Sequence, residues 1–264
     1  MQAPEPRDDL ALITDAALSA GQSALQFFRS DFKRWEKDGG AGPVTEADLT
    51  VDAELGSLLR AARPDYGWLS EESNAKGWQD RSRIFVIDPI DGTRSFIEGS
   101  RTWAISIAVI ENGHPIAAVV HLPAREMTYA AAIHAGATKN GDPIAASNAS
   151  NAEEAHFLSA KVNFQPERWA KPIIAPRISF RSSLAYRMAL VAEGRFDAMV
   201  TLRRTWDWDV AAGTLLVTEA GGNVRVPKGT APSFGNAERS QPGLLAGSKP
   251  LVSWMLGHGP RLPA

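Results

Sequence analysis

The segment FVIDPIDGT, residues 85–93, places an apolar strand directly before two aspartates that are three residues apart. The proline inside it predicts that the hydrogen-bonding ladder of the strand stops there, because proline has no N–H to donate. Together with Gly92, it favours a tight turn in which the carboxylates of Asp88 and Asp91 and the carbonyl of Ile90 face one point. Hard divalent cations bind such sets of oxygens. An ordinary Asp-Pro turn is the alternative interpretation.

Helical patterns precede this segment and hairpin patterns follow it. Residues 9–29 and 45–62 carry apolar side chains at three- and four-residue spacing, which predicts two amphipathic helices. Thr45 and Asp48 form a capping-box pattern at the start of the second helix. Short apolar runs separated by turn signals such as Asn112-Gly113 predict a sheet built largely from hairpins. These runs are residues 84–87, 103–110, 115–122 and 127–133.

The second half of the chain alternates strand and helix patterns. Strands are predicted over residues 156–160, 177–180 and 196–200, and helices over residues 182–193 and 209–220. This rhythm predicts a layered, mixed α/β (α+β) fold. There is no obvious flexible linker, although residues 135–155, which are rich in Ala, Asn, Gly and Ser, could separate two halves. We therefore expect a single domain over residues 1–264, with subdomains of approximately 1–140 and 150–264.

The composition limits the kinds of metal site and ligand that the chain can have. The 264 residues include no cysteine, so disulfides and thiolate metal sites are excluded and any metal needs oxygen or imidazole ligands. Lysine and arginine total 28 against 30 acids, which argues against a nucleic acid polymer as partner and favours a small ligand. The first ten residues lack the basic start and apolar run of a signal peptide, and no later run has the roughly 18 apolar residues of a membrane span. We expect a cytoplasmic protein.

Further acids stand where strand or helix ends would project them. Glu71 follows an apolar pair in WLSEES, and a strand end there would point it into the same cleft as Asp88, whereas Glu72 is expected to be a solvated loop acid. Asp207 and Asp209 begin a helix, where either could act only as a cap. Asp48 is on the apolar face of its helix, so it either caps the helix or, with Thr93, orients a water.

Several carboxylates at one point require a cation. Each like-charge pair at about 4 Å costs on the order of 4 kcal/mol at an effective dielectric constant of about 20. Two divalent ions roughly 4 Å apart relieve this repulsion, bind a phosphate oxygen and activate a water, which suits the hydrolysis of a phosphate monoester.

Four motifs together resemble those of the inositol monophosphatase family. They are VTEAD (44–48), SEES (70–73), DPIDGT (88–93) and WDVAAG (208–213), in the order and approximate spacing of that family. The resemblance implies a layered αβαβα sandwich, a lithium-sensitive and magnesium-dependent phosphatase, and a homodimer. A serine at position 70 replaces a glycine that is common in relatives, and we expect it to be tolerated.

The resemblance also implies a role for each matching residue. One Mg²⁺ would be held by Glu71, Asp88 and the Ile90 carbonyl, a second by Asp88, Asp91 and Asp209, and a third, weaker ion by Glu71 and waters. The remaining roles are deprotonation of the attacking water by Asp48 with Thr93, phosphate binding by the amides of Gly92 and Thr93, and a lysine near the site, Lys37. The doubled WDWD fits the family motif with Asp209 as the ligand, which leaves Asp207 as a cap or surface residue.

The substrate has to be inferred from other residues. Inositol-specific members place an acid shortly before the WD motif, but AMVTLRRT contains none and has Arg203 and Arg204 instead. Two guanidiniums could bind a second phosphate, so the chain looks more similar to adenosine 3',5'-bisphosphate nucleotidases, and we expect AMP and phosphate as products. A solvated basic strand end is the alternative. Inositol-1-phosphate and other sugar, polyol or histidinol phosphates remain alternative substrates, and a regulatory, protein-binding role on a phosphatase scaffold is a rival from another class.

Overall fold

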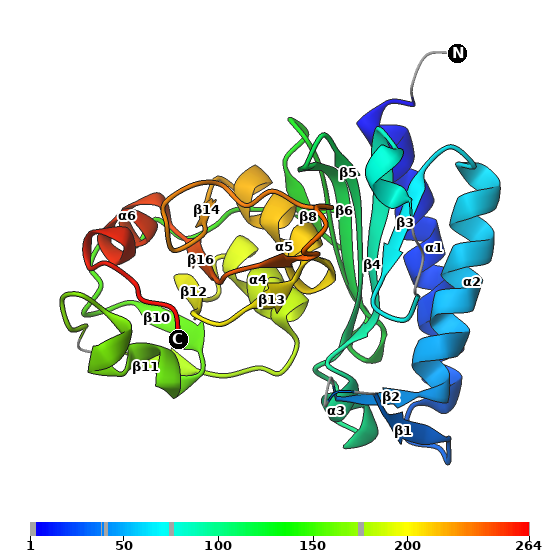
Figure 1. Ribbon diagram of the computed structural model, residues 1–264, viewed down its shortest axis with the longest axis horizontal. Coiled ribbons are helices and arrows are strands. Elements are labelled where there is room, and N and C mark those ends of the chain that lie inside the picture. Colours follow the sequence, from blue (N-terminus) through cyan, green and yellow to red (C-terminus); the bar gives the residue numbers. More distant parts are fainter. Residues whose placement is uncertain (1–3, 38, 40–41, 74–76, 174–176, 264) are drawn as a thin grey trace.

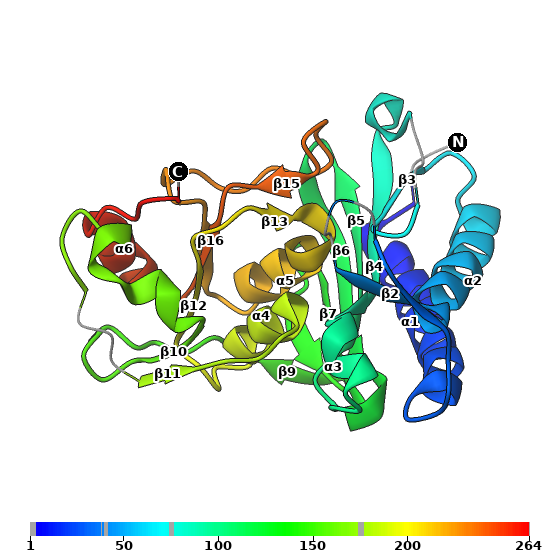
Figure 2. The ribbon, with the colours of Figure 1, turned by 60° about the horizontal axis from the view of Figure 1, so that its bottom comes forward.

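The computed structural model describes residues 4–37, 39, 42–73, 77–173 and 177–263. Two sheets and three layers of helices alternate along the long axis (Figures 1 and 2), as the αβαβα prediction requires. α1 and α2 cover one face of the first sheet, and α4 and α5 lie between the two sheets. α6 packs on β14 and β16 of the second sheet. The helices are α1 (Pro6–Phe27), α2 (Glu46–Ala62), α3 (Thr93–Ile97), α4 (Leu184–Ala192), α5 (Asp207–Glu219) and α6 (Lys249–Gly257).

The first sheet is seven-stranded, in the order β3-β4-β5-β6-β7-β8-β9. β3 pairs with β4 in parallel, and every later pair in this sheet is antiparallel, which confirms the hairpin prediction. Asn112 and Asn140 both have φ of 51°, a conformation that asparagine tolerates better than most residues. The strands are β3 (Gly67–Ser70), β4 (Arg83–Asp91), β5 (Ala104–Glu111), β6 (His114–Leu122), β7 (Met127–Ala132), β8 (Ala137–Lys139) and β9 (Asp142–Ile144).

The proline interrupts the ladder as predicted, but it does not end the strand. β4 continues through Pro89 to Asp91, and its register against β5 shifts between Asp88 and Asp91. A bulge of this kind leaves residues outside the regular ladder, so the missing N–H of proline costs little there. The shift also re-aims the strand end, and this is how both aspartates come to project from one strand toward one region.

The second sheet is five-stranded and mixed, in the order β11-β10-β12-β16-β14. The predicted strands and helices of this half are all present. The strands are β10 (His156–Ser159), β11 (Arg177–Ser179), β12 (Ala198–Thr201), β14 (Asn223–Arg225) and β16 (Leu244–Gly247). Two short ribbons complete the structure: β1 (Arg34–Glu36) with β2 (Pro43–Thr45), and β13 (Thr205–Trp206) with β15 (Ser240–Gln241).

The central helices approach each other closely. A Cβ added to Gly213 of α5 would lie 2.5 Å from Cβ of Met188 in α4, so only glycine fits at this crossing. This close approach lets α4 and α5 pack directly against each other.

A buried polar cluster ties α1 to the first sheet. The carboxylate of Asp9, fully buried, accepts hydrogen bonds from Arg63 Nε (2.9 Å), Arg83 Nη1 (3.1 Å) and Tyr66 Oη (2.8 Å). In the part of the chain that the structure describes, no helix has both the length and the apolar composition needed to span a membrane.

Candidate metal centre

The parallel pairing of β3 with β4 places the first two acids side by side. Ser70 is the register partner of Ile87, and the amide of Glu71 donates to the carbonyl of Ile87 at 3.1 Å. The chain therefore leaves β3 at Glu71 next to Asp88 on β4. Neighbouring parallel strands end at the same edge of a sheet, so this adjacency follows from the topology.

Three carboxylates meet at this edge. Oxygens of Asp88, Asp91 and Asp209 lie within 4.8 Å of one another, with Asp209 contributed by the first turn of α5. Asp88 and Asp91 are buried, and Asp209 is half-buried. Two of these acids come from the bulged end of β4 and the third from a helix more than a hundred residues later in the chain.

Burial and mutual repulsion disfavour the charged forms of these acids. Burial first, and then the negative charges of Glu71, Asp91 and Asp209, raise the pKa of Asp88 well above its ordinary value. Burial and the charges of Asp91 and Glu71 do the same to the pKa of Asp209. A divalent cation removes this penalty, and an all-oxygen donor set suits a hard cation. The residues present therefore fit the metal that the sequence predicted.

Asp91 is held by the start of α4. Its Oδ2 accepts hydrogen bonds from Ser183 Oγ (2.7 Å) and from the amide of Ala185 (2.6 Å). Ser183 also caps α4 by accepting from the amide of Tyr186. Burial raises the pKa of Asp91 to about 6, although these hydrogen bonds oppose the shift. One oxygen is thus fixed by two donors, which leaves the other available to a cation.

Asp48 caps its helix and also contacts Thr93. Its Oδ2 accepts from the amide (2.8 Å) and Oγ1 (2.5 Å) of Thr45, which completes the capping box of α2. Its Oδ1 lies 3.2 Å from Thr93 Oγ1, which also lies 3.2 Å from the carbonyl of Ile90. Burial raises the pKa of Asp48 to about 6. The structure brings Asp48 and Thr93 into hydrogen-bonding contact beside the strand that carries the metal-site acids.

Gly92 forms the turn between β4 and α3. Its φ is 100°, a conformation that glycine adopts without strain, and an added Cβ would lie 3.3 Å from the carbonyl oxygen of Thr102. α3 starts at Thr93, immediately after this turn. The turn predicted from the sequence is present, with Thr93 at the edge of the carboxylate cluster.

Lys37 reaches the same edge from the β1–β2 ribbon. Its Nζ lies 2.6 Å from Glu71 Oε1 and 2.6 Å from Glu72 Oε1. The expectation that Glu72 is a solvated loop acid is wrong, because its side chain is 5% exposed. The family resemblance placed Lys37 near the site, and nothing in the local sequence indicated that it forms ion pairs with Glu71 and Glu72.

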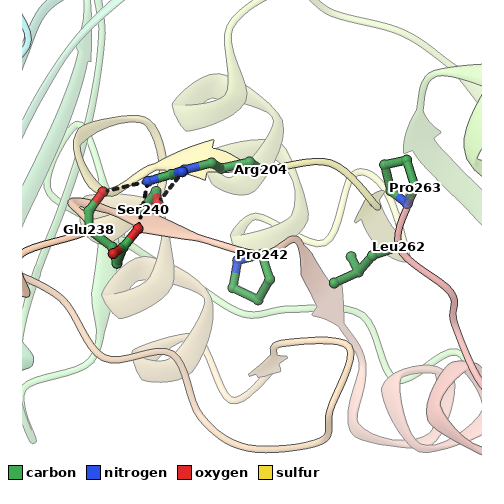
Figure 3. Close-up of a pocket in the computed structure, with 6 residues that line it drawn as sticks. All are labelled: Arg204, Glu238, Ser240, Pro242, Leu262 and Pro263. Carbon is green, nitrogen blue, oxygen red and sulfur yellow. Dashed lines mark hydrogen bonds and ion pairs between the residues drawn. The ribbon is translucent and has the colours of Figure 1, made fainter.

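The two arginines before the WD motif point to different places. Figure 3 shows Arg204 in a surface pocket of about 410 Å³, where its guanidinium donates to Ser240 Oγ (2.7 Å) and to Glu238 (3.0 Å). Arg204 also lies over the ring of Trp206. The positive charge of Arg203, in contrast, partly opposes the rise in the pKa of Asp209 that burial and the neighbouring acids cause. Of the two, Arg203 is the one whose charge reaches the carboxylate cluster.

Of the two aspartates in WDWD, Asp209 is the one that belongs to the carboxylate cluster. Asp207 is neither a surface residue nor a helix cap as expected. It is fully buried and accepts from the amide of Gly235 (2.8 Å) and Nε2 of Gln241 (2.8 Å). Asp207 thus connects the β13–β15 ribbon to α5, and Asp209 belongs to the carboxylate cluster.

Sequence reasoning missed Ser183 as a contact of Asp91, although a serine before an apolar helical run is an N-cap signal.

Comparisons with known proteins agree with this geometry. The sequence matches the inositol monophosphatase family over residues 6–253. It is 37% identical over 193 residues to the "Fructose-1,6-bisphosphatase/inositol-1-monophosphatase" of Thermotoga maritima, covering 72% of this chain and 73% of the relative. It is 31% identical over 248 residues to the histidinol-phosphatase of Mycobacterium tuberculosis, covering 90% and 95%.

A solved structure, the IMPase of Thermotoga maritima, matches with a TM-score of 0.81 and 30% identity, covering 95% of this chain and 96% of that one. The family match over residues 6–253 includes both segments that carry the clustered acids, the end of β4 and the first turn of α5. The chain belongs to the inositol monophosphatase family and is a metal-dependent phosphomonoesterase.

Proposed function

We propose that the protein uses Mg²⁺ to hydrolyse a small sugar or polyol phosphate monoester by direct attack of water. The observation that carries this proposal is the cluster of Asp88, Asp91 and Asp209, whose oxygens lie within 4.8 Å of one another. Glu71 and the carbonyl of Ile90 would complete the ligand set, as the family resemblance implies. Bound divalent cations would polarise the phosphate oxygens and lower the pKa of the attacking water. We propose two or three ions per site.

Residues of the first half of the chain would accept the proton of the attacking water and bind the phosphate. Thr93 Oγ1 contacts Asp48, whose other oxygen is already occupied by Thr45, so the pair has a fixed geometry. Asp48 would accept the proton that the water passes through Thr93. A carboxylate with a pKa near neutrality accepts a proton more readily than an ordinary one, and burial raises the pKa of Asp48 to about 6. The amides at Gly92 and Thr93 would hold the phosphate.

The relatives support polyol and sugar phosphates better than a nucleotide. The relatives reported above are named for fructose bisphosphate, inositol phosphate and histidinol phosphate. The proposal of adenosine 3',5'-bisphosphate depended on Arg203 and Arg204 acting together, and Arg204 forms an ion pair with Glu238 instead. Adenosine 3',5'-bisphosphate is therefore no longer the leading candidate and is tested as one of several substrates.

Phosphate release from a substrate panel tests the proposal. The panel contains inositol 1-phosphate, histidinol phosphate, fructose 1,6-bisphosphate and adenosine 3',5'-bisphosphate, each with Mg²⁺ and with EDTA. We expect hydrolysis to require Mg²⁺, and Asp209→Asn to lower kcat/KM by more than about 100-fold, because it removes a metal ligand. Glu238→Gln, on the surface pocket, is the control and should keep wild-type activity. Release that persists in EDTA or in Asp209→Asn contradicts the proposal.

A regulatory role through a protein partner is the second candidate, and a homodimer is the proposed assembly. All the ligands that the family resemblance implies are present in this chain, which favours catalysis. Asp88→Asn distinguishes the two roles: an unchanged cellular function after this substitution would favour regulation.

A further inference from the structure

Ser70 has a buried hydroxyl that joins two elements of the candidate metal centre. It is the last residue of β3, is 1% exposed, and pairs with Ile87, the residue before Asp88 on β4. Its Oγ donates a hydrogen bond to Oδ1 of Asp52 in α2. From the sequence we expected a serine here only to be tolerated, but the structure gives its hydroxyl a specific partner.

Asp52 belongs to the helix that carries the proposed proton acceptor. It lies four residues after Asp48, and residues four apart in an α-helix lie on the same side. Asp52 is half-buried and, among the residues that the structure describes, forms no ion pair. The hydrogen bond from Ser70 therefore ties the end of β3 to the part of α2 that follows Asp48.

The same hydroxyl faces the turn that follows β3. The amide of Glu72 lies 3.4 Å from Ser70 Oγ, and the amide of Glu71 donates to the carbonyl of Ile87 at 3.1 Å. A hydroxyl donates one hydrogen bond and also accepts, so Ser70 contacts α2 and this turn at the same time. Because Ser70 is buried, water cannot take over these contacts in a variant that lacks the hydroxyl.

We propose that Ser70 and Asp52 form a positioning pair, which holds Glu71 in the orientation that binds Mg²⁺ beside Asp88. This inference rests on the proposed function, which assigns Glu71 to the metal. Neither member of the pair would touch the metal or the substrate. A ligand that is already ordered binds more tightly than one that must be ordered on binding. Loss of the Ser70–Asp52 hydrogen bond would therefore weaken the binding of Mg²⁺ and leave the chemical step largely intact.

Calorimetric titration of Mg²⁺ into the protein, without substrate, tests the pair. We expect Ser70→Ala and Asp52→Ala each to raise the Kd for Mg²⁺ about 10-fold, the lower end of the effect of losing an outer partner of a metal ligand. Asp52→Asn keeps an oxygen that accepts from Ser70, so its Kd should stay within about threefold of wild type. The double variant Ser70→Ala/Asp52→Ala should bind Mg²⁺ no more weakly than either single variant, because both changes break the same hydrogen bond.

Steady-state assays at varied Mg²⁺ provide a second readout. The Mg²⁺ concentration for half-maximal activity should rise by the same factor as the Kd in Ser70→Ala. At saturating Mg²⁺, kcat should stay within about threefold of wild type.

Ser19→Ala is the matched control. Ser19 Oγ in α1 donates to Oε1 of Glu54 in α2 at 2.6 Å, so this exposed pair also joins α2 to a neighbouring element through a serine and a carboxylate. The variant should bind Mg²⁺ as wild type does. Urea unfolding of each variant in EDTA measures any loss of stability separately from the loss of Mg²⁺ affinity.

Two results would overturn the inference. An unchanged Kd for Mg²⁺ in Ser70→Ala and Asp52→Ala, even with a lower unfolding midpoint, would show that the pair is only structural. An effect of Asp52→Asn as large as that of Asp52→Ala would show that the charge of Asp52 is responsible and not the hydrogen bond. If Ser70→Ala does not fold, Asp52→Ala breaks the same hydrogen bond from the half-buried side.

Failure of the proposed function has a different signature. If the wild-type protein binds Mg²⁺ but hydrolyses none of the four esters, the phosphatase proposal fails, and calorimetry still decides the role of Ser70 and Asp52. If the wild-type protein binds no Mg²⁺, both proposals are overturned. Hydrolysis by the wild type together with an unchanged Mg²⁺ affinity in Ser70→Ala and Asp52→Ala overturns the positioning pair alone.

Discussion

Lowering the pH should stabilise the metal-free protein, the reverse of ordinary acid denaturation. The pKa of Asp91 is raised from 3.8 to about 6 by burial, and burial with neighbouring negative charges raises the pKa of Asp88 and Asp209. Each carboxyl therefore binds its proton more tightly in the folded than in the unfolded state. The free energy of unfolding should fall as the pH rises from about 4 to about 6 and should stay at this lower value above that range.

The structure sets the size of this effect. The pKa of Asp91 differs by about two units between the two states, and each unit corresponds to about 1.4 kcal/mol, so this group alone accounts for about 3 kcal/mol. Asp88 and Asp209 add to it in the same direction. A domain has only about 5–15 kcal/mol of stability, so the change is well within reach of measurement.

Urea unfolding provides the assay, at about pH 5 and about pH 7.5, with EDTA and with saturating Mg²⁺. In EDTA, the unfolding midpoint should be higher at the lower pH. With Mg²⁺ this difference should disappear or reverse, because the cation takes the place of the protons. Asp88→Asn removes one repelling charge and should raise the metal-free midpoint at about pH 7.5. A metal-free midpoint that is unchanged or lower at about pH 5, or a less stable Asp88→Asn, would refute the electrostatic account of this centre.

Three further outcomes follow from single contacts. Thr93→Ala should lower kcat about 100- to 1,000-fold, because it removes the hydroxyl that passes the proton to Asp48. Thr93→Ser keeps the hydroxyl and should lose much less activity. Equal losses of kcat in the two variants, measured in steady-state assays, would contradict this role. Ser183→Ala removes a helix cap and a donor to a buried carboxylate, so urea unfolding should show a loss of about 2–4 kcal/mol, and Ser183→Thr should recover much of it. Asp9→Ala removes the buried carboxylate that pairs with Arg63 and Arg83, and it should cost about 3–5 kcal/mol by the same measurement. Glu111 accepts from Arg83 Nε at 2.7 Å and its side chain is 36% exposed, so Glu111→Ala should cost less than about 1 kcal/mol. Equal costs of the two substitutions would show that burial of Asp9 is not the cause.

The sequence by itself predicted the elements and the acids that matter. The helices at 6–27 and 46–62, the hairpins and the capping box at Thr45 all rest on patterns within a few residues, which act before any long-range contact forms. The paired acids of DPIDGT were identified from residue type and short-range spacing, whereas the choice of Asp209 over Asp207 came from the family resemblance. The αβαβα layering came from the family resemblance and is confirmed by the packing of the helices.

Only the tertiary structure decided where the long-range partners lie. The side chain of Glu72 is buried against Lys37, Asp207 is buried against Gln241, and Arg204 forms an ion pair with Glu238. Adjacent residues such as Arg203 and Arg204 have the same local pattern but opposite surroundings. Side-chain direction at the end of an element depends on register and packing against segments that are distant in sequence, and local periodicity carries no information about either.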